Sequence, residues 1–204
     1  MTIHATPIDP HQITAVLLCG GQARRLGGVQ KALLSYRGRP LLSWTMQQLT
    51  GEVGGFVISA NRDLDAYRAF GAAVIADRTP DLGPLGGLCT ALDMVRTSWV
   101  FACPGDMPFL GGQVVRRLAL YAESEMAVYA SDGERDHYLC TLLRTDCARA
   151  LDDYLNSGAR SVHGFLREIG ALRVEMPDLA RCFVNVNDPT SLASLMNDDQ
   201  SSMD

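Results

Sequence analysis

The apolar residues of this chain gather in short runs that are separated by longer amphipathic stretches. The runs occupy residues 13–19, 56–60, 73–76, 99–103, 126–130, 138–143 and 183–186. Their length and their content of β-branched and aromatic residues are typical of strands. Several runs are apolar throughout rather than at alternate positions, which is expected for central strands of a largely parallel sheet that helices cover on both faces.

The stretches between these runs carry the periodicity and the start signals of helices. We expect helices over residues 40–49, 63–70, 85–95, 112–122, 146–155, 162–169 and 189–196. Pro189 follows Asp188 as a first-turn proline follows an N-cap residue, and Pro40 opens its helix in the same way. This alternation predicts an α/β fold, here a single three-layer α/β/α domain over residues 12–196, with flexible polar tails at 1–11 and 197–204. Ligands of such sheets lie at the carboxyl ends of the strands.

Composition agrees with one domain and excludes several classes of function. The chain has 204 residues, of which 47% are apolar, and a net charge of −5. That charge argues against non-specific binding of nucleic acid, although a lysine, a few amides and a metal ion can still hold a triphosphate. We see no secretory signal and no run of ~20 apolar residues that would span a membrane, so we expect a cytoplasmic protein. The six cysteines show no C-x-x-C spacing and are expected to be reduced packing residues.

A glycine-rich segment follows the first predicted strand directly. It reads LCGGQARRLGG over residues 18–28 and continues as VQK to Lys31. Glycines let backbone amides approach an anion closely, because no Cβ intervenes and a positive φ costs little. The spacing is that of neither a dinucleotide fingerprint nor a P-loop, in which Ser or Thr would replace Ala32. The segment predicts a phosphate-binding turn of another kind, and the alternative is a flexible surface loop with incidental basic residues.

The motif L-x-G-G-x-x-x-R-[LM]-G-G-x-x-K-x-L-L, followed by G-[KR]-P-L, resembles the opening of the MobA-type molybdenum cofactor guanylyltransferases. These enzymes belong to a superfamily with the sugar-phosphate nucleotidyltransferases. Later stretches fit the same family in order: Asp77, GPLGG at 83–87, CPGDMP at 103–108, DGERDH at 132–137 and FVNVN at 183–187. The opening alone indicates the superfamily, whereas the stretches at 132–137 and 183–187 resemble the molybdenum branch. The matching segments extend from Ile13 to about Leu195.

The resemblance implies a Rossmann-like nucleotidyltransferase fold and a Mg²⁺-dependent reaction. In that reaction the terminal phosphate of molybdopterin attacks the α-phosphorus of GTP, pyrophosphate leaves, and a guanine dinucleotide forms. The nucleophile is already an anion, so catalysis consists of aligning two anions and neutralising the charge between them. We expect neither a general base nor a covalent intermediate. GTP and molybdopterin are the implied substrates, and transient contact with molybdoenzymes or other proteins of cofactor biosynthesis is compatible with this role.

The resemblance assigns catalytic roles to Lys31, Asp106 and Arg25. Asp106 follows the run 99–103, so its carboxylate is expected beside the glycine-rich turn, where it would bind Mg²⁺ with phosphate oxygens and water. A turn aspartate before Met107 is the alternative. Lys31 suits the phosphates as a compact point charge, and its alternative is a solvated lysine.

The resemblance also implies a set of nucleotide-binding residues, comprising Leu18, Cys19, Gly20, Gly21, Lys31, Ser59, Asp77 and Asp106. Asp77 would accept hydrogen bonds from the ring N–H and the amine of guanine and so select guanine over adenine, with a loop-capping aspartate as the alternative. The family often has asparagine at the place of Ser59, so either this serine or Asn61 makes the nucleotide contact. Gln30 and Cys19 replace the more frequent Asp and Ala, and both changes leave the turn intact.

Three residues are expected on the pterin side: Arg135, Asn185 and Asn187. The two asparagines are separated by one residue on an extended segment and therefore face the same side. An amide oxygen can complete a magnesium shell or accept from a substrate hydroxyl, and an Asx turn is the alternative for Asn187. Arg135 would hold a phosphate, unless the segment 132–137 is an ordinary solvated hairpin tip. We interpret His137 as a binding or structural residue.

Competing functions differ in how well they fit. A CTP-using molybdopterin cytidylyltransferase or a sugar-phosphate nucleotidyltransferase would use the same chemistry, but relatives that use CTP tend to have Ala-Gly in place of Gly20 and Gly21. A cofactor-binding adaptor without activity would not need both Lys31 and Asp106. A Rossmann-type oxidoreductase is remote, because the G-x-G-x-x-G fingerprint is absent.

Overall fold

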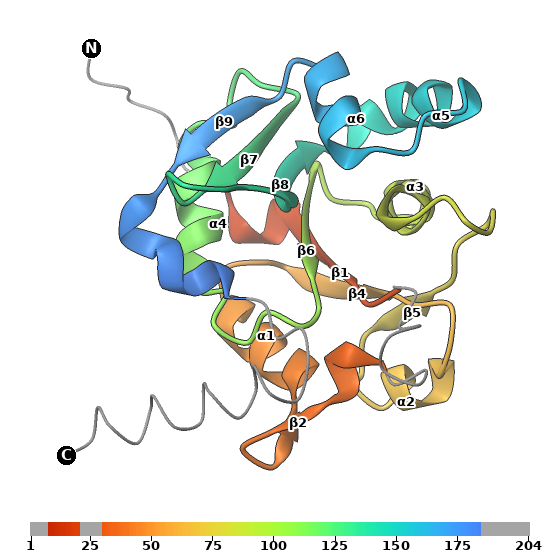
Figure 1. Cartoon of the computed structure of the whole chain (residues 1–204), viewed down its shortest axis with the longest axis vertical. Coiled ribbons are helices and arrows are strands. Elements are labelled where there is room, and N and C mark those ends of the chain that lie inside the picture. The colour runs from red at the N-terminus through yellow and green to blue at the C-terminus, as the bar shows by residue number, and fades with distance from the viewer. Residues whose placement is uncertain (1–7, 21–29, 185–204) are drawn as a thin grey trace.

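The computed structural model describes residues 8–20 and 30–184, which form helices on both sides of one central sheet (Figure 1). The sheet has seven strands in the order β5-β4-β1-β6-β8-β7-β9. In chain order the strands are β1 (Ile13–Leu18), β4 (Gly55–Ser59), β5 (Ala73–Ile75), β6 (Trp99–Pro104), β7 (Ala127–Ser131), β8 (Asp136–Arg144) and β9 (Leu172–Glu175). All but β9 coincide with predicted apolar runs, so the predicted three-layer α/β/α fold is confirmed.

The direction of the strands explains where a ligand site can form. β5, β4, β1 and β6 are mutually parallel, β8 is antiparallel to both of its neighbours, and β7 pairs parallel with β9. Only β8 therefore runs against the other strands of this sheet. The carboxyl ends of the other strands share one edge with the amino end of β8, and this is the edge at which parallel sheets bind ligands.

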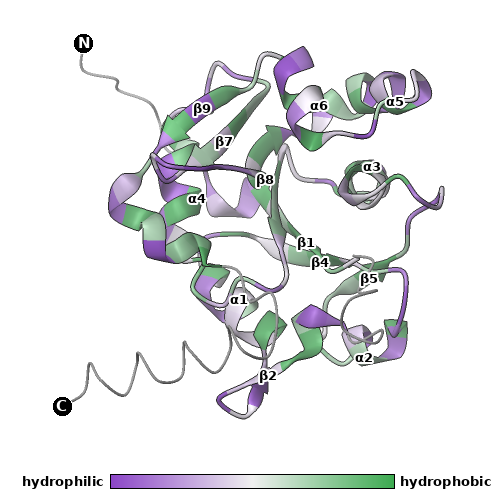
Figure 2. Cartoon of the chain, in the orientation of Figure 1, coloured by the Kyte–Doolittle hydropathy of each residue, from purple (hydrophilic) through white to green (hydrophobic). Residues whose placement is uncertain are grey.

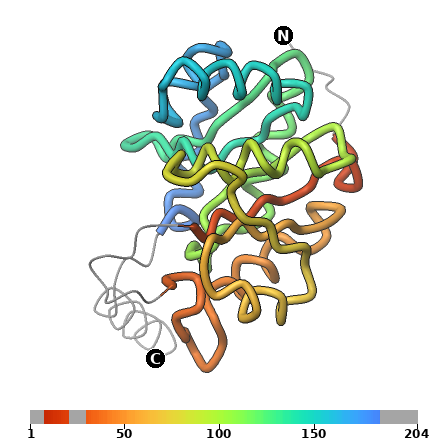
Figure 3. Tube along the Cα trace, turned by 90° about the vertical axis from the view of Figure 1, so that its right-hand side faces the viewer, coloured from red at the N-terminus to blue at the C-terminus, as the bar shows by residue number. Residues whose placement is uncertain are grey.

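Helices cover the two faces of the sheet as separate layers. One layer contains α1 (Leu41–Leu49), α2 (Leu64–Arg68) and α4 (Gly112–Ala119), and the other contains α3 (Pro84–Met94), α5 (Ala148–Asn156) and α6 (Val162–Glu168). Figure 3 shows the second layer from outside. Short elements complete the described chain: η1 (Pro10–Gln12), η3 (Lys31–Leu33), η4 (Thr145–Cys147), η5 (Pro177–Phe183) and the hairpin of β2 (Ser35–Tyr36) and β3 (Arg39–Pro40).

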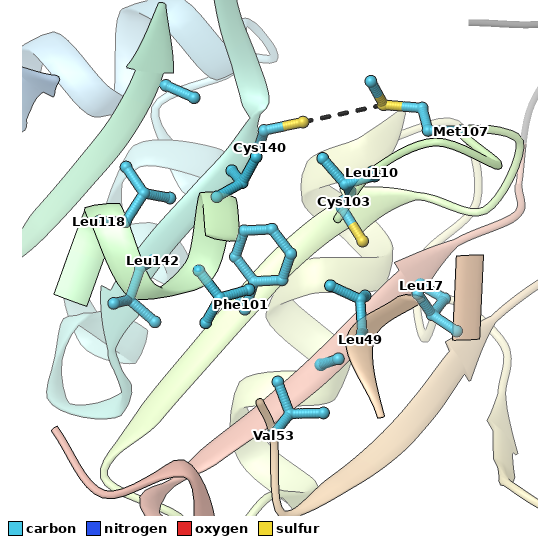
Figure 4. Close-up of a cluster of buried hydrophobic side chains, with 14 of the residues drawn as sticks. Leu17, Leu49, Val53, Phe101, Cys103, Met107, Leu110, Leu118, Cys140 and Leu142 are labelled. Carbon is cyan, nitrogen blue, oxygen red and sulfur yellow. Dashed lines mark hydrogen bonds between the residues drawn. The ribbon is translucent and has the colours of Figure 1, made fainter. Parts of the chain in front are cut away.

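The central strands are apolar throughout because both of their faces are buried. In β1, Ile13, Ala15 and Leu17 belong to the core under α1 and α4, whereas Val16 belongs to the core under α3, α5 and α6. Figure 2 shows the strands as the most hydrophobic part of the fold. Leu17 and Phe101 lie in the first of these cores (Figure 4). Each fully buried side chain of this size contributes ~1.5–3 kcal/mol, so the strand ends are held on a firmly packed scaffold.

The carboxyl-terminal expectations were partly wrong. Phe183 was predicted to begin a strand, but it ends η5, and Val184 after it is not in a strand. Pro177 stands in the first turn of η5, where its missing N–H suits a helix start better than a sheet ladder. The rest of the run 183–186, the helix 189–196 and most of both predicted tails fall outside the described residues.

Two further expectations concern cysteines and membranes. All six cysteines are free thiols, and four of them are buried, as predicted for packing residues. Within the part of the chain that the structure describes, every helix is too short or too polar to cross a bilayer.

Candidate nucleotide and acceptor site

Backbone hydrogen bonds extend the sheet past the ends of its parallel strands. The amide of Cys19 donates to the carbonyl of Ser59 over 2.8 Å, and the amide of Gly105 donates to the carbonyl of Leu18 over 3.2 Å. On the other side of β4, Ala60 donates to Ile75 over 2.9 Å. The segments that follow β4, β1 and β6 are therefore held side by side, as the sequence predicted for the residues around Gly20, Ser59 and Asp106.

The turn that carries Asp106 packs closely against the start of the glycine-rich segment. A Cβ placed on Gly105 would lie 2.4 Å from the sulfur of Cys19 and 3.2 Å from Leu42, so only glycine fits this position without displacement of its neighbours. From α1, the buried hydroxyl of Thr45 donates to the carbonyl of Gly105 over 3.3 Å. The two contacts fix the backbone just before Asp106.

Asp106 is partly buried, and the charge of Lys31 acts on it. Burial raises the pKa of the Asp106 carboxyl, while the positive charge of Lys31 and a backbone hydrogen bond oppose that rise. Lys31 begins η3, and Gln30 separates it from the segment 21–29. The structure thus brings together the two described residues to which the sequence assigned catalytic roles.

A reciprocal pair of hydrogen bonds joins Asp77 to Asn61. The Nδ2 of Asn61 donates to Oδ2 of Asp77 over 2.9 Å, and the backbone amide of Asp77 donates to Oδ1 of Asn61 over 2.8 Å. Burial raises the pKa of Asp77, and the hydrogen bond from Asn61 lowers it in part. This pair connects the segments after β4 and β5 at the edge of the candidate site.

The first turn of α3 lies against both Asp77 and Ser59. A Cβ on Gly86 would lie 3.0 Å from Oδ2 of Asp77, and a Cβ on Gly87 would lie 2.0 Å from the hydroxyl oxygen of Ser59. Ser59 is buried, whereas Asn61 is exposed. The GPLGG motif is therefore explained by close helix–strand packing, a role that the sequence reasoning did not assign to it.

The turn between β7 and β8 lies at the same edge, because β7 ends there and β8 begins there. Oδ1 of Asp132 accepts from the amides of Glu134 and Arg135 over 2.9 and 2.7 Å, and Oδ2 lies 2.8 Å from Nε2 of His137. Desolvation of this carboxylate raises its pKa, but the hydrogen bonds from His137 and the two amides outweigh that effect and lower the pKa of Asp132 to about 2. The side chain of Arg135 is exposed at this turn.

A cavity of about 430 Å³ opens between the end of β6, the start of β8, the start of α6 and the end of η5. Its lining includes Met107, His137, Tyr138, His163 and Phe183. The rings of His137 and Phe183 are stacked with centroids 4.1 Å apart and 9° between their planes, and Tyr138 contacts His163 with centroids 4.9 Å apart. The walls of this cavity can therefore hold a flat, partly polar group.

Sequence reasoning found one rim of this cavity and missed most of its lining. It identified His137 and the segment 132–137, but it gave no role to Tyr138, His163 or Phe183 as ring contacts. The predicted residues Gly21, Arg25, Asn185 and Asn187 lie outside the described residues, so their roles stay predictions.

Comparison with known proteins identifies the family. The model of the MobA-like NTP transferase domain matches residues 15–172. The chain belongs to this family. Among curated members, the molybdenum cofactor guanylyltransferase of Mannheimia succiniciproducens is 38% identical over 185 residues, which cover 89% of this chain and 97% of the relative. The molybdenum cofactor guanylyltransferase of Serratia proteamaculans is 37% identical over 177 residues, covering 86% and 90%.

Two solved structures share the fold of this chain. Molybdopterin-guanine dinucleotide biosynthesis protein A from Archaeoglobus fulgidus aligns with a TM-score of 0.75 at 20% identity, covering 93% of this chain and 99% of that one. The 2-C-methyl-D-erythritol 4-phosphate cytidylyltransferase from Thermus thermophilus aligns with a TM-score of 0.66 at 17% identity, covering 89% and 98%. At these identities the likeness concerns the fold, and it agrees with the nucleotidyltransferase architecture expected from the sequence.

Proposed function

We propose that this chain transfers GMP from GTP to molybdopterin, releases pyrophosphate and requires Mg²⁺. The curated relatives that match most of the chain carry the name of this activity. The observation in the structure that best supports the proposal is the order of chemical groups along one sheet edge. Asp77 follows β5, the glycine-rich segment follows β1, Asp106 follows β6, and the acceptor cavity begins at β8.

This order matches the order of the parts of the two substrates. Neighbouring strands are ~4.8 Å apart, so the ends of β5 and β6 are separated by three such spacings, or ~14 Å. Guanine would bind by Asp77, the phosphates would bind at Gly20 and Lys31, and the α-phosphorus would lie near Asp106. The pterin would enter the cavity lined by Tyr138 and His163, so that its phosphate points back toward the α-phosphorus.

The residues at the edge fit a magnesium ion that is shared with the substrate. Asp106 is a partly buried carboxylate at a strand end, and Mg²⁺ in nucleotide enzymes commonly takes one or two carboxylates and completes its shell with phosphate oxygens and water. Within residues 8–20 and 30–184 no cluster of three or more acidic, histidine or cysteine side chains forms a cage for a metal. When bound, Mg²⁺ would neutralise charge on the phosphates.

The chain's own residues would act by position and charge. Lys31 would stabilise the negative charge that develops between the two phosphates, and Asp106 would hold the magnesium ion. The phosphate nucleophile needs no proton removed, so His137 is not required as a base. His137 has one ring nitrogen engaged by Asp132 and one face engaged by Phe183, which suits a wall of the acceptor cavity.

Pyrophosphate release with molybdopterin, Mg²⁺ and either GTP, CTP or ATP tests the proposal. We expect release with GTP and formation of a product with the mass of the guanine dinucleotide. Faster release with CTP would instead make the chain a cytidylyltransferase. Release that occurs with a sugar phosphate but not with molybdopterin would overturn the proposed acceptor.

A further inference from the structure

The amide side chain of Asn61 is held in one orientation by Asp77. Oδ1 of Asn61 accepts from the backbone amide of Asp77, and of the two ends of the side-chain amide only the oxygen can accept a hydrogen bond. The opposite end of the amide must then be the donor Nδ2, and it faces Oδ2 of the Asp77 carboxylate. Both groups of Asn61 are thereby committed to a residue that is 16 positions away in sequence.

This arrangement fixes the plane of the Asp77 carboxylate. A carboxylate offers about four lone-pair sites on two oxygens. Asn61 occupies one site on Oδ2, so Oδ1 and the second site of Oδ2 are left to accept from a ligand. Two acceptors in one fixed plane match two neighbouring N–H donors on the edge of a purine base, as guanine has and adenine lacks.

Ser59 does not hold the Asp77 carboxylate in this way. Its hydroxyl lies under Gly87 in the first turn of α3, whereas Asn61 is exposed at the rim. Arg78 is a charged neighbour of Asp77 in sequence. Its guanidinium pairs with Asp93 on α3 rather than with the Asp77 carboxylate. The Asp77 carboxylate is therefore oriented by the hydrogen bond from the exposed amide of Asn61, together with the packing of the first turn of α3 against it.

We propose that Asn61 is a positioning residue that holds Asp77 in the plane required to select guanine. This inference rests on the proposed function, because it assigns the discrimination between bases to the pair rather than to Asp77 alone. It also predicts a change in acid sensitivity. The hydrogen bond from Asn61 lowers the pKa of Asp77, so loss of the bond raises that pKa and makes nucleotide binding fail at a higher pH.

The test compares Asn61→Ala with wild type in pyrophosphate release and in direct nucleotide binding. We expect KM for GTP to rise about tenfold, as for loss of a hydrogen bond to a charged group, with little change in kcat. Preference for GTP over ITP, which lacks the exocyclic amine, should shrink. The acid limb of GTP affinity should move to higher pH. Asn156→Ala, at the exposed end of α5, is the matched control and should match wild type.

The outcomes separate the two proposals. If wild type prefers CTP or releases no pyrophosphate, the proposed function fails before Asn61 is considered. If wild type uses GTP while Asn61→Ala keeps its KM, its GTP/ITP preference and its pH profile, only the role of Asn61 is overturned. A lower thermal midpoint without any of these kinetic changes would also overturn it, because a merely structural bond between two loops would produce that result.

Discussion

The carboxylate of Asp132 and the imidazole of His137 are joined across the β7–β8 turn, with Oδ2 and Nε2 2.8 Å apart. The same carboxylate accepts from two backbone amides of the turn. One side chain thus shapes the turn and also fixes the ring that stacks on Phe183 in the wall of the acceptor cavity.

Asp132→Asn should weaken acceptor binding and lower stability at neutral pH, and the difference in stability from wild type should shrink in acid. The pKa of Asp132 is lowered from 3.8 to about 2 in the folded chain, chiefly by the hydrogen bonds from His137, Arg135 and Glu134 against the cost of desolvation. A carboxyl whose pKa is lower in the folded than in the unfolded chain stabilises the fold at pH values above its unfolded pKa. This contribution is lost as the pH falls from about 4, the unfolded pKa, to about 2, the folded pKa. Calorimetry at pH 7 should show a lower melting temperature for the variant.

The kinetic part of this prediction distinguishes the two substrates. Loss of the hydrogen bond between Asp132 and His137 should raise KM for molybdopterin and leave KM for GTP close to that of wild type. Equal increases in both KM values would contradict the placement of the acceptor at this turn.

Lys31→Ala should lower kcat more than it weakens GTP binding. Lysine that stabilises charge developing during transfer acts in the transition state, and loss of one such electrostatic donor typically costs ~10²- to 10³-fold in rate. Lys31→Arg should rescue poorly, because a planar guanidinium cannot take the place of a compact ammonium. Pyrophosphate release at saturating GTP measures both variants, and equal rates in wild type and both variants would exclude the catalytic role.

Asp106→Asn should abolish turnover and yet stabilise the protein without nucleotide and Mg²⁺. Burial raises the pKa of Asp106 despite the nearby charge of Lys31. A carboxyl with a raised folded pKa stabilises the fold at low pH, and this contribution is lost as the pH rises through that pKa. At pH 7 the melting temperature of the variant should exceed that of wild type, and the difference should shrink toward pH 4. Binding of GTP should also lose its dependence on Mg²⁺, and a variant with full activity would end the metal role.

Tyr67→Phe should leave stability unchanged or raise it. Tyr67 is fully buried on α2, and among the described residues its hydroxyl has no hydrogen-bond partner of acceptable geometry, although the Cys19 thiol lies nearby. A buried hydroxyl without a partner costs ~1–3 kcal/mol. Tyr154→Phe is the matched control, because the Tyr154 hydroxyl donates to the carbonyl of Ser161 over 3.0 Å. Its loss should lower stability by ~1 kcal/mol, and chemical denaturation of both variants would reveal the contrast.

The parts of the fold that follow from local patterns could be predicted. β1 and β6 are apolar on both faces, so their runs are unmistakable in the sequence. β9 escaped prediction because it is a short edge strand in which Val174 is buried while Leu172, Arg173 and Glu175 are exposed. Phe183 was misassigned because its burial comes from packing on His137 and not from a sheet ladder.

The candidate site likewise has a part that could be predicted from the sequence and a part that could not. Asp106, Lys31 and Asp77 follow strands or a glycine-rich segment, so their convergence could be inferred from the rule that parallel strands end at one edge. The acceptor cavity could not be foreseen, because Met107, Tyr138, His163 and Phe183 come from four separate segments that have no common local signal. The hydrogen bonds of Asn61 with Asp77 likewise depend on a register between two loops.

The reversed strand β8 divides the edge at which we propose that both substrates bind into two structurally separate parts. In the proposed arrangement the four parallel strands from β5 to β6 would present the nucleotide half, where glycines pack closely against neighbouring segments. The proposed acceptor half would instead depend on the hairpin of β7 and β8, whose turn lies at this edge. On this proposal, a substitution at the turn would alter the choice of acceptor without shifting the strands that would hold the nucleotide.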